Sequence, residues 1–231
     1  MGRSTVDCNA AGARSPIVGI RCFDVLCVES EETRQKFDTA FGHEIQRACL
    51  EIDKLWDEIF NEIKPVEERQ AYVRTLFLSG SNFLFASCQT FRLGLFSSSV
   101  GLLRPAWESF FTALLCSTKQ LDVFERYKAD RYSVNDSLRD VKKHYRRFKL
   151  DKTVLDQINT VQGKILNKNI HPAQLALAAD YLMGEGAGVS LGGHFDPAKR
   201  QQYLWLINAV TKIANAGFQL LQISLASMAA R

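Results

Sequence analysis

Apolar residues recur every three or four positions through most of the chain, with polar residues between them. The clearest case runs from Glu31 to Ile63, where this spacing puts the large apolar side chains on one stripe of an α-helix. A second helix is predicted from about residue 66 to about Gly94, because Pro65 and the acidic residues after it suit a helix start. The first stripe consists of Phe37, Phe41, Ile45, Cys49, Ile52, Trp56, Ile59 and Ile63.

The next two helices are less regular. Ser97–Ser99 form a break of small residues, after which Leu103 and the aromatic residues following it predict a third helix. Because an interior proline is costly in a helix, that helix either kinks at Pro105 or begins there, and a kinked helix is favoured. Residues 122–148 predict a fourth, polar helix with basic last turns.

The last part of the chain predicts shorter elements and one long helix. Short helices are expected over residues 152–166 and 172–183, followed by a glycine-rich loop at 184–193 that lacks the lysine of a phosphate-binding loop. Asp196 as N-cap and Pro197 in the first turn then open the final helix.

These patterns predict an all-α fold, a helical bundle of about four long and two short helices without a sheet. Residues 1–29 have no sustained period and are expected to form a loosely ordered arm, and residues 30–231 a single domain. No apolar run is long enough and free enough of charge to cross a membrane, so no membrane partner is expected.

Composition narrows the function classes only slightly. The chain is 46% hydrophobic and 23% charged, as in ordinary globular proteins, and no secretory signal is recognised, so a cytoplasmic location is expected. Its net charge of +4 is spread over 29 basic and 25 acidic residues, so nucleic-acid binding would need a local patch. The six cysteines form no C-x-x-C pair and indicate buried free thiols, and no residue cluster predicts a metal or cofactor.

Arg104 and Glu108 lie at i and i+4 on the edge of an apolar helical stripe. Charges at such positions must pair with each other or with another helix, because an unpaired buried charge is costly. The pair is either a salt bridge that fixes helix register or part of a polar pocket.

Two histidines are candidates for acid–base chemistry. His194 lies between the glycine-rich loop and the last helix, where it either bonds to backbone or serves as an acid or base. His144 follows Arg139 at a spacing that resembles the R-x4-6-H motif of metal-independent helical ribonucleases. The alternative for this segment is a solvated basic helix end. Its candidate RNA-binding residues are Lys142, Lys143, Arg146, Arg147 and Lys149.

Two blocks of the chain resemble a bacterial family of uncharacterised all-helical proteins. In the block from Val73 to Tyr127, the family pattern L-L-R-x3-E is matched by Leu102, Leu103, Arg104 and Glu108. The second block carries a tyrosine and an S-x3-H pattern ahead of the last helix, matched by Tyr181, Ser190 and His194.

That family is similar to the HEPN superfamily and to abortive-infection proteins. The resemblance implies a homodimer with a polar site of Arg104, Glu108 and His194 that acts on an RNA phosphodiester, arginine stabilising charge and histidine moving a proton. The chain departs from the superfamily pattern, because the Arg139–His144 match does not open the last helix and no arginine lies five to seven residues before His194.

Two functions of different classes remain open. The first is a metal-independent ribonuclease or defence component acting on RNA or a nucleotide, with Arg104, Glu108 and His194, or alternatively Arg139 and His144, as its catalytic residues. The second is a non-catalytic interaction or ligand-binding module that dimerises through its bundle face. One open cleft lined by Arg104, Glu108 and His194 would favour the first, and separate, paired side chains would favour the second.

Overall fold

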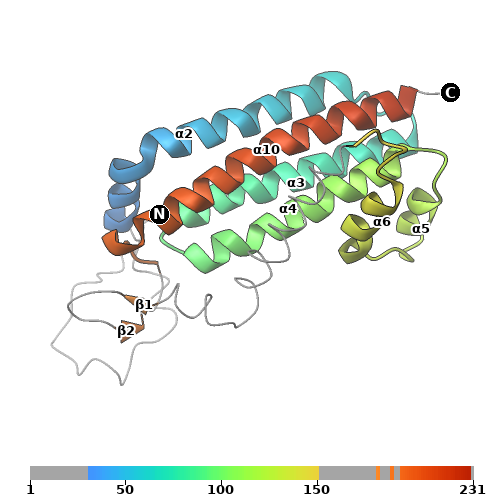
Figure 1. The fold of residues 1–231 in the computed structure, drawn as a ribbon. Helices are drawn as coiled ribbons and strands as arrows, with labels where there is room; N and C mark the ends of the chain where they lie inside the picture. The colour runs from blue at the N-terminus through green and yellow to red at the C-terminus, as the bar shows by residue number, and fades with distance from the viewer. Residues whose placement is uncertain (1–30, 151–180, 183–187, 190–192, 230–231) are drawn as a thin grey trace, which may run out of the picture.

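The computed structural model of the protein describes residues 31–150, 181–182, 188–189 and 193–229. Its long helices lie side by side (Figure 1), and two short helices pack at one end of them. The predicted all-α helical bundle is thereby confirmed; the described residues form four long helices and two short ones, and the short ones lie at other positions than predicted. The long helices are α2 (Glu31–Glu62), α3 (Glu68–Arg92), α4 (Phe96–Ser117) and α10 (Arg200–Ala229), and the short ones are α5 (Val123–Lys128) and α6 (Ser137–His144).

Side-chain bonds show how the long helices run relative to one another. Trp56 Nε1 donates to Ser81 Oγ at 2.7 Å, while Asp38 pairs with Arg92, so α2 and α3 are antiparallel. Arg47 bonds to Asn208 and Glu58 to Gln222, so α10 runs parallel to α2. α10 also packs against α4, which closes a four-helix ring around one core.

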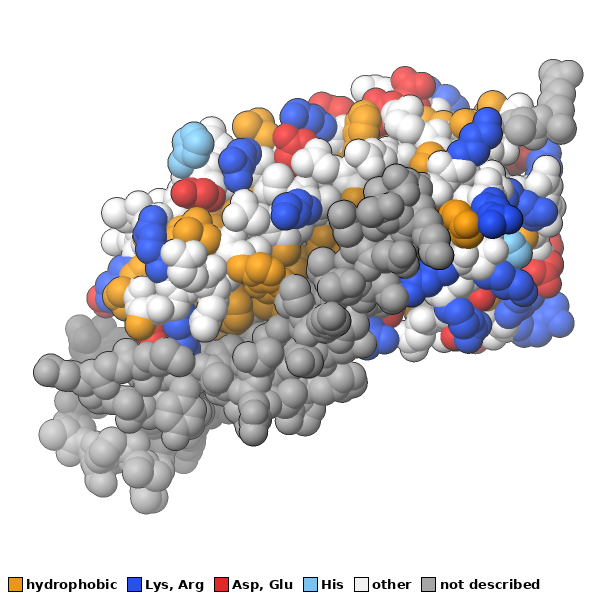
Figure 2. Space-filling model, in the orientation of Figure 1, with side chains coloured by type: hydrophobic (Ala, Val, Ile, Leu, Met, Phe, Trp, Pro, Cys, Tyr) orange, Lys and Arg blue, Asp and Glu red, His pale blue; other side chains and the backbone are white. Residues whose placement is uncertain are grey.

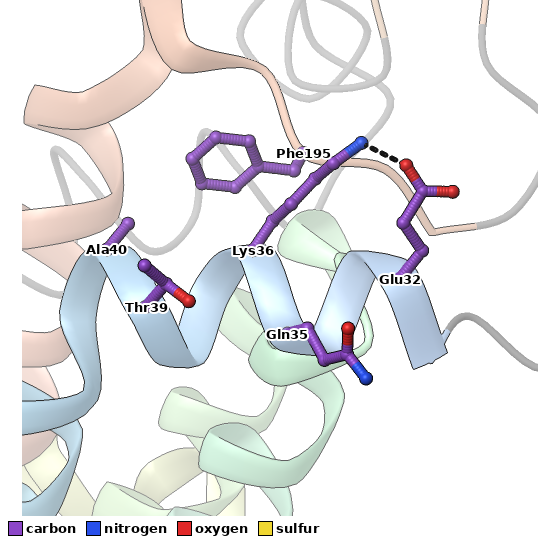
Figure 3. Close-up of a pocket in the computed structure, with 6 residues that line it drawn as sticks. All are labelled: Glu32, Gln35, Lys36, Thr39, Ala40 and Phe195. Carbon is purple, nitrogen blue, oxygen red and sulfur yellow. Dashed lines mark ion pairs between the residues drawn. The ribbon is translucent and has the colours of Figure 1, made fainter.

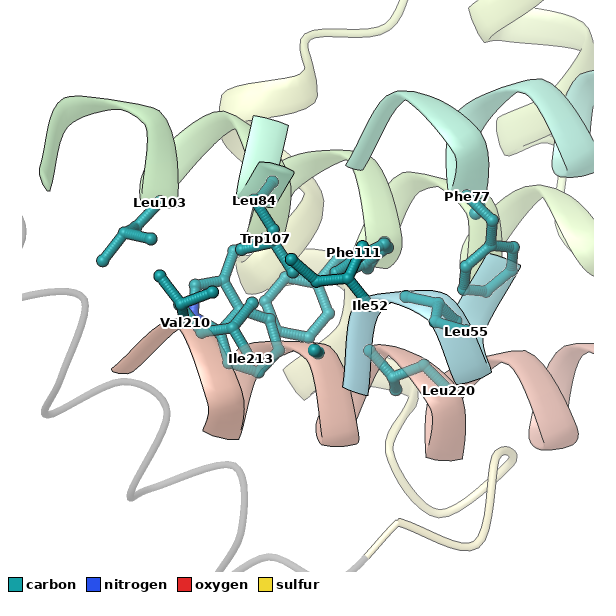
Figure 4. Packing of buried hydrophobic residues seen from close by; sticks show 14 of the residues in the cluster. Ile52, Leu55, Phe77, Leu84, Leu103, Trp107, Phe111, Val210, Ile213 and Leu220 are labelled. Carbon is teal, nitrogen blue, oxygen red and sulfur yellow. The ribbon is translucent and has the colours of Figure 1, made fainter. Parts of the chain in front are cut away.

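The core follows the apolar stripes of the sequence. Phe37, Ile52 and the other buried positions of α2 meet the buried faces of α3, α4 and α10. Figure 4 shows Leu84, Trp107 and Val210 converging from three different helices. The predicted amphipathic helices therefore bury the faces that their periods specify.

Close helix contacts depend on two glycines beside one ring. A Cβ on Gly80 of α3 or on Gly217 of α10 would collide with the buried ring of Phe110 of α4. The ring of Phe110 also stacks on Phe77 with centroids 5.8 Å apart. Absence of a side chain at both glycines lets three helices approach one another around this ring.

The predicted break at Ser97–Ser99 is wrong, because α4 already begins at Phe96. The turn lies instead at Gly94, whose φ of 75° favours glycine, with the Leu95 amide donating to the Thr90 carbonyl at 3.0 Å. This hydrogen bond closes α3 and lets α4 start two residues later. The helix then continues through Pro105, so Pro105 does not begin it.

The predicted single helix over residues 122–148 is also wrong. Asp130 adopts a φ of 54°, and the Arg131 amide bonds to the Arg126 carbonyl at 2.8 Å, which ends α5. After the 3-10 turn η1 (Val134–Asp136), α6 folds separately against α4. Each of the two short helices buries apolar side chains against the bundle, Phe124 from α5 and Val141 from α6.

The helix predicted over residues 172–183 is wrong at its C-terminal end. Residues 181–182 form strand β1 (Tyr181–Leu182), paired antiparallel with β2 (Gly188–Val189). The predicted absence of any sheet is therefore wrong by this two-residue ladder, the sole sheet within the described residues. The arm at 1–29, the helix at 152–166 and the start of the helix at 172–183 lie outside those residues.

The 3-10 turn η3 (Pro197–Lys199) opens α10 as predicted, with Asp196 accepting from the Ala198 amide at 2.9 Å. Over the part of the chain that the structure describes, no helix is long and apolar enough to cross a membrane.

Candidate functional site

Arg104 and Glu108 form the ion pair that their spacing predicts. Arg104 Nε donates to Glu108 Oε1 at 2.7 Å, with 26% of the arginine side chain and 10% of the glutamate side chain exposed. The arginine also donates from Nη2 to Asn135 Oδ1 at 3.3 Å. The pair therefore ties α4 to η1, as a structural salt bridge does.

η1 brings a second arginine into the neighbourhood of this pair. Asp136, next to Asn135, accepts from Arg139 Nη1 at 2.9 Å, and Asp140 lies 3.3 Å from Arg139 Nε. Arg104 and Arg139 thus belong to adjoining polar contacts at the α4–α6 junction. Sequence reasoning missed Asn135, although the run Asn135-Asp136-Ser137 before a basic helix is a typical N-terminal signal.

His194 lies elsewhere in the bundle. Its amide donates to the Gly94 carbonyl at 3.4 Å, at the turn between α3 and α4. A Cβ at Gly94 would lie 2.5 Å from the His194 nitrogen, and one at Gly193 would collide with the Leu93 carbonyl oxygen. Arg104 is eight residues into α4, or about 12 Å along its axis from this turn. The predicted grouping of His194 with Arg104 and Glu108 is therefore not assembled within this chain.

Arg139 and His144 share α6 but point in different directions. Five residues on a helix correspond to a rotation of roughly 140°. The side chain of Arg139 is 69% exposed and is held by the two aspartates. Burial, followed by the charges of Lys143 and Arg147, lowers the pKa of His144 from its usual value and so favours the neutral ring.

Tyr132 is a buried polar residue that the sequence reasoning did not select. Its ring lies under Arg126, with the guanidinium carbon 5.3 Å from the ring centroid. Burial and the nearby charge of Asp140 raise the pKa of Tyr132 above its usual range. A neutral phenol here supports the packing of α6 and adds no acid–base group at neutral pH.

A turn over residues 145–150 follows the end of α6. The Leu150 amide donates to the Tyr145 carbonyl at 3.0 Å, and Lys149 adopts a φ of 52°. Arg147 donates from Nη1 to the Gln120 carbonyl at 3.3 Å. Figure 2 shows Lys and Arg side chains gathered at the end of the molecule that carries α5 and α6. We call the set Lys142, Lys143, Arg146, Arg147 and Lys149 the basic end.

A hollow of about 450 Å³ lies on α2, away from the basic end. Figure 3 shows Phe195 facing Lys36 and Ala40 across it, with Lys36 paired to Glu32 at 2.6 Å. The ring of Phe195 is fixed by Phe37, whose centroid is 5.0 Å away. Because its one lysine is neutralised by a carboxylate on the same helix, this lining has no charge left to recognise an anion.

Within the described ranges, no three His, Cys, Asp or Glu side chains lie close enough together to hold a metal ion. Comparison of the chain with protein-family models, curated proteins and solved structures gives no match.

Proposed function

We propose that the protein binds RNA through the basic end. The observation that carries this proposal is that the basic end makes no ion pairs with the described residues. None of the five cations of the basic end is paired with a carboxylate among the described residues. Elsewhere on the surface, by contrast, Lys54 pairs with Glu51 and Lys128 with Glu68.

The distribution of charge along the chain supports a local patch. Residues 119–150 contain ten Lys or Arg and five Asp or Glu, a net charge of +5, whereas the whole chain carries +4. The rest of the chain is therefore almost neutral. Concentrated, unpaired cations on one surface favour a ligand with closely spaced negative charges, such as a phosphate backbone.

Binding is better supported than cleavage. Arg139 is engaged by two aspartates and Arg104 by Glu108, and no hydrogen bond or ion pair joins either guanidinium to a histidine among the described residues. The interaction module was the function expected for such separate, paired side chains. A homodimer and a cytoplasmic location, both expected from the sequence, belong to the same proposal.

Cleavage is a second candidate, favoured by one observation. His144 lies within the basic end, and its lowered pKa keeps the ring in the neutral form that a general base needs. If the protein cuts RNA in the presence of a chelator, His144→Ala should abolish cutting and leave binding intact. Loss of cutting in His194→Ala alone would assign the chemistry to the other histidine.

The binding proposal is tested with a fluorescent single-stranded RNA and a paired set of charge reversals. Lys143→Glu with Arg147→Glu should weaken binding at least tenfold and reduce the slope of log affinity against log salt by about 1.4, since each phosphate contact contributes about 0.7. Arg34→Glu with Lys36→Glu makes the same change in net charge near the start of α2, at the opposite end of the bundle (Figure 1). This control should bind like the parent protein.

Two outcomes would contradict the proposal. One is no binding by the parent protein at low salt, and the other is equal weakening by both double variants, which would indicate attraction by net charge alone. Tighter binding to anionic phospholipid vesicles than to RNA would assign the basic end to a membrane surface instead.

A further inference from the structure

Two cysteine thiols from different helices meet in the bundle. The thiols of Cys49 in α2 and Cys88 in α3 lie close enough to perturb each other's ionisation. Cys88 is buried, with 7% of its surface exposed, whereas Cys49 is only half-buried. One thiol of the pair is thus open to a small reagent and the other lies behind it.

The register of the two helices brings these thiols together independently. Trp56 of α2 bonds to Ser81 of α3 at 2.7 Å. Seven residues back along α2 lies Cys49, and seven residues forward along α3 lies Cys88. Because the helices are antiparallel, both steps run in the same direction, and each covers about 10.5 Å along the helix axis. Seven residues make nearly two turns, so Cys49 lies on the same face of α2 as Trp56, and Cys88 on the same face of α3 as Ser81.

A second cross-helix contact fixes the other side of the pair. Arg92, one turn beyond Cys88, donates from Nε to Asp38 Oδ1 at 2.7 Å. The two thiols therefore lie between the Trp56–Ser81 bond and this ion pair. Helices held on both sides keep the sulfur atoms near each other in the folded protein.

The surroundings make the two thiols chemically unequal. Interaction with the Cys88 side chain lowers the pKa of Cys49 to about 7, with a smaller favourable effect from Arg92, against burial and the charge of Asp53. The same interaction, together with burial, raises the pKa of Cys88 far above its usual range. Cys49 is therefore the thiol that ionises at neutral pH, and the thiolate is the nucleophile in thiol chemistry.

We propose that Cys49 is an oxidation site for hydrogen peroxide and that Cys88 resolves it, forming a reversible disulfide between α2 and α3. The Cys49 thiolate attacks one peroxide oxygen, the O–O bond breaks, and the departing hydroxide is protonated to water, leaving a sulfenic acid. The sulfur of Cys88 then attacks Cys49 Sγ, loses its proton and expels the hydroxyl group as a second water. Two thiols are oxidised by two electrons and one peroxide is reduced, while a dithiol reductant reverses the disulfide.

Cys116 provides an internal comparison. It is fully buried in α4, and burial raises its pKa to about 12. Its sulfur should react with peroxide or with iodoacetamide at least tenfold more slowly than that of Cys49 in the folded protein.

The test uses the full chain under limiting hydrogen peroxide, followed by alkylation, proteolysis and mass spectrometry. The expected product is a peptide pair joined through Cys49 and Cys88, lighter by two hydrogen atoms and absent after treatment with dithiothreitol. In Cys88→Ser, dimedone should trap a sulfenic acid at Cys49, whereas Cys49→Ser should leave Cys88 unmodified.

The parent protein alone can decide the proposal if a serine variant fails to fold. Absence of the Cys49–Cys88 peptide pair, or reaction of Cys49 at the rate of Cys116, would overturn it. A dominant disulfide from Cys49 to Cys8, Cys22 or Cys27 would equally overturn it, because the helix register would then not select the partner. None of these outcomes depends on whether the protein binds RNA.

Discussion

Glu108 illustrates how one charged residue is tolerated beside a helical core. The residue is 8% exposed, and its carboxylate is satisfied by Arg104, which is itself anchored to Asn135. Leaving a buried charge without its partner costs more than the intact pair contributes, because desolvation is no longer offset. The Arg104–Glu108 pair therefore holds α4 against η1.

Glu108→Gln preserves the volume of the side chain and removes its charge. We expect it to lower the free energy of unfolding by about 1–3 kcal/mol, less than for a fully buried pair because Arg104 is partly exposed. Urea denaturation measures the change. Glu32→Gln, in the exposed pair with Lys36, should have little effect. A double-mutant cycle with Arg104→Gln that shows no coupling would disprove the assignment.

At the scale of elements, the bundle depends on how closely its helices approach one another. Gly42 and Gly101 are helical glycines with nothing within 4 Å of a Cβ placed on them, whereas Gly80 and Gly217 touch the ring of Phe110. Glycine is unfavourable inside a helix unless packing requires it. Only the second pair therefore has a structural reason to be glycine.

Gly217→Ala and Gly42→Ala make the same chemical change with opposite expected results. A Cβ at position 217 would lie 2.8 Å from Phe110 Cε2, and the overpacking should lower the free energy of unfolding by about 1–3 kcal/mol. At position 42 the added methyl group meets no neighbour, so stability should rise by about 0.5–1 kcal/mol. Denaturant titration of both variants checks this, and equal stabilities would refute the role of Phe110.

At the scale of the whole molecule, the net positive charge is concentrated in residues 119–150, at one end of the bundle. The basic end adjoins His144, whose pKa is lowered by burial and by Lys143 and Arg147. A bound phosphate would offset those cations and raise the pKa of His144 in the complex. Binding should then take up a proton.

We therefore expect RNA affinity to increase as the pH falls from 8 to 5.5. The gain in RNA affinity is largest below the pKa of His144 in the free protein. It is lost as the pH rises through the higher pKa that His144 has in the complex. A rise of one pKa unit would give up to about tenfold tighter binding. Fluorescence anisotropy measures the affinity, and His144→Gln should remove this dependence. A parent protein with pH-independent affinity would show that phosphate does not approach His144.

How far each element could be predicted depends on the range of the interactions that define it. The stripe beginning at Phe37, and the Asp196 cap of the last helix, are local patterns, and both appear as expected. The left-handed turn at Asp130 could not be predicted locally, because Asp takes that conformation only when the packing of α5 and α6 against α4 favours it. The candidate site was predicted in part, since Arg104 and Glu108 meet within one helix while His194 does not join them.

The sequence by itself determined the helical class, the buried faces and the Arg104–Glu108 pair, because an apolar stripe and an i,i+4 contact depend only on the 3.6-residue repeat. Tertiary structure alone decided that Arg104 reaches Asn135, that Gly193 lies against Leu93, and that Cys49 faces Cys88. Each of these contacts joins residues far apart along the chain. The register of one helix against another, set by packing of whole faces, selects such partners, and no local pattern contains that register.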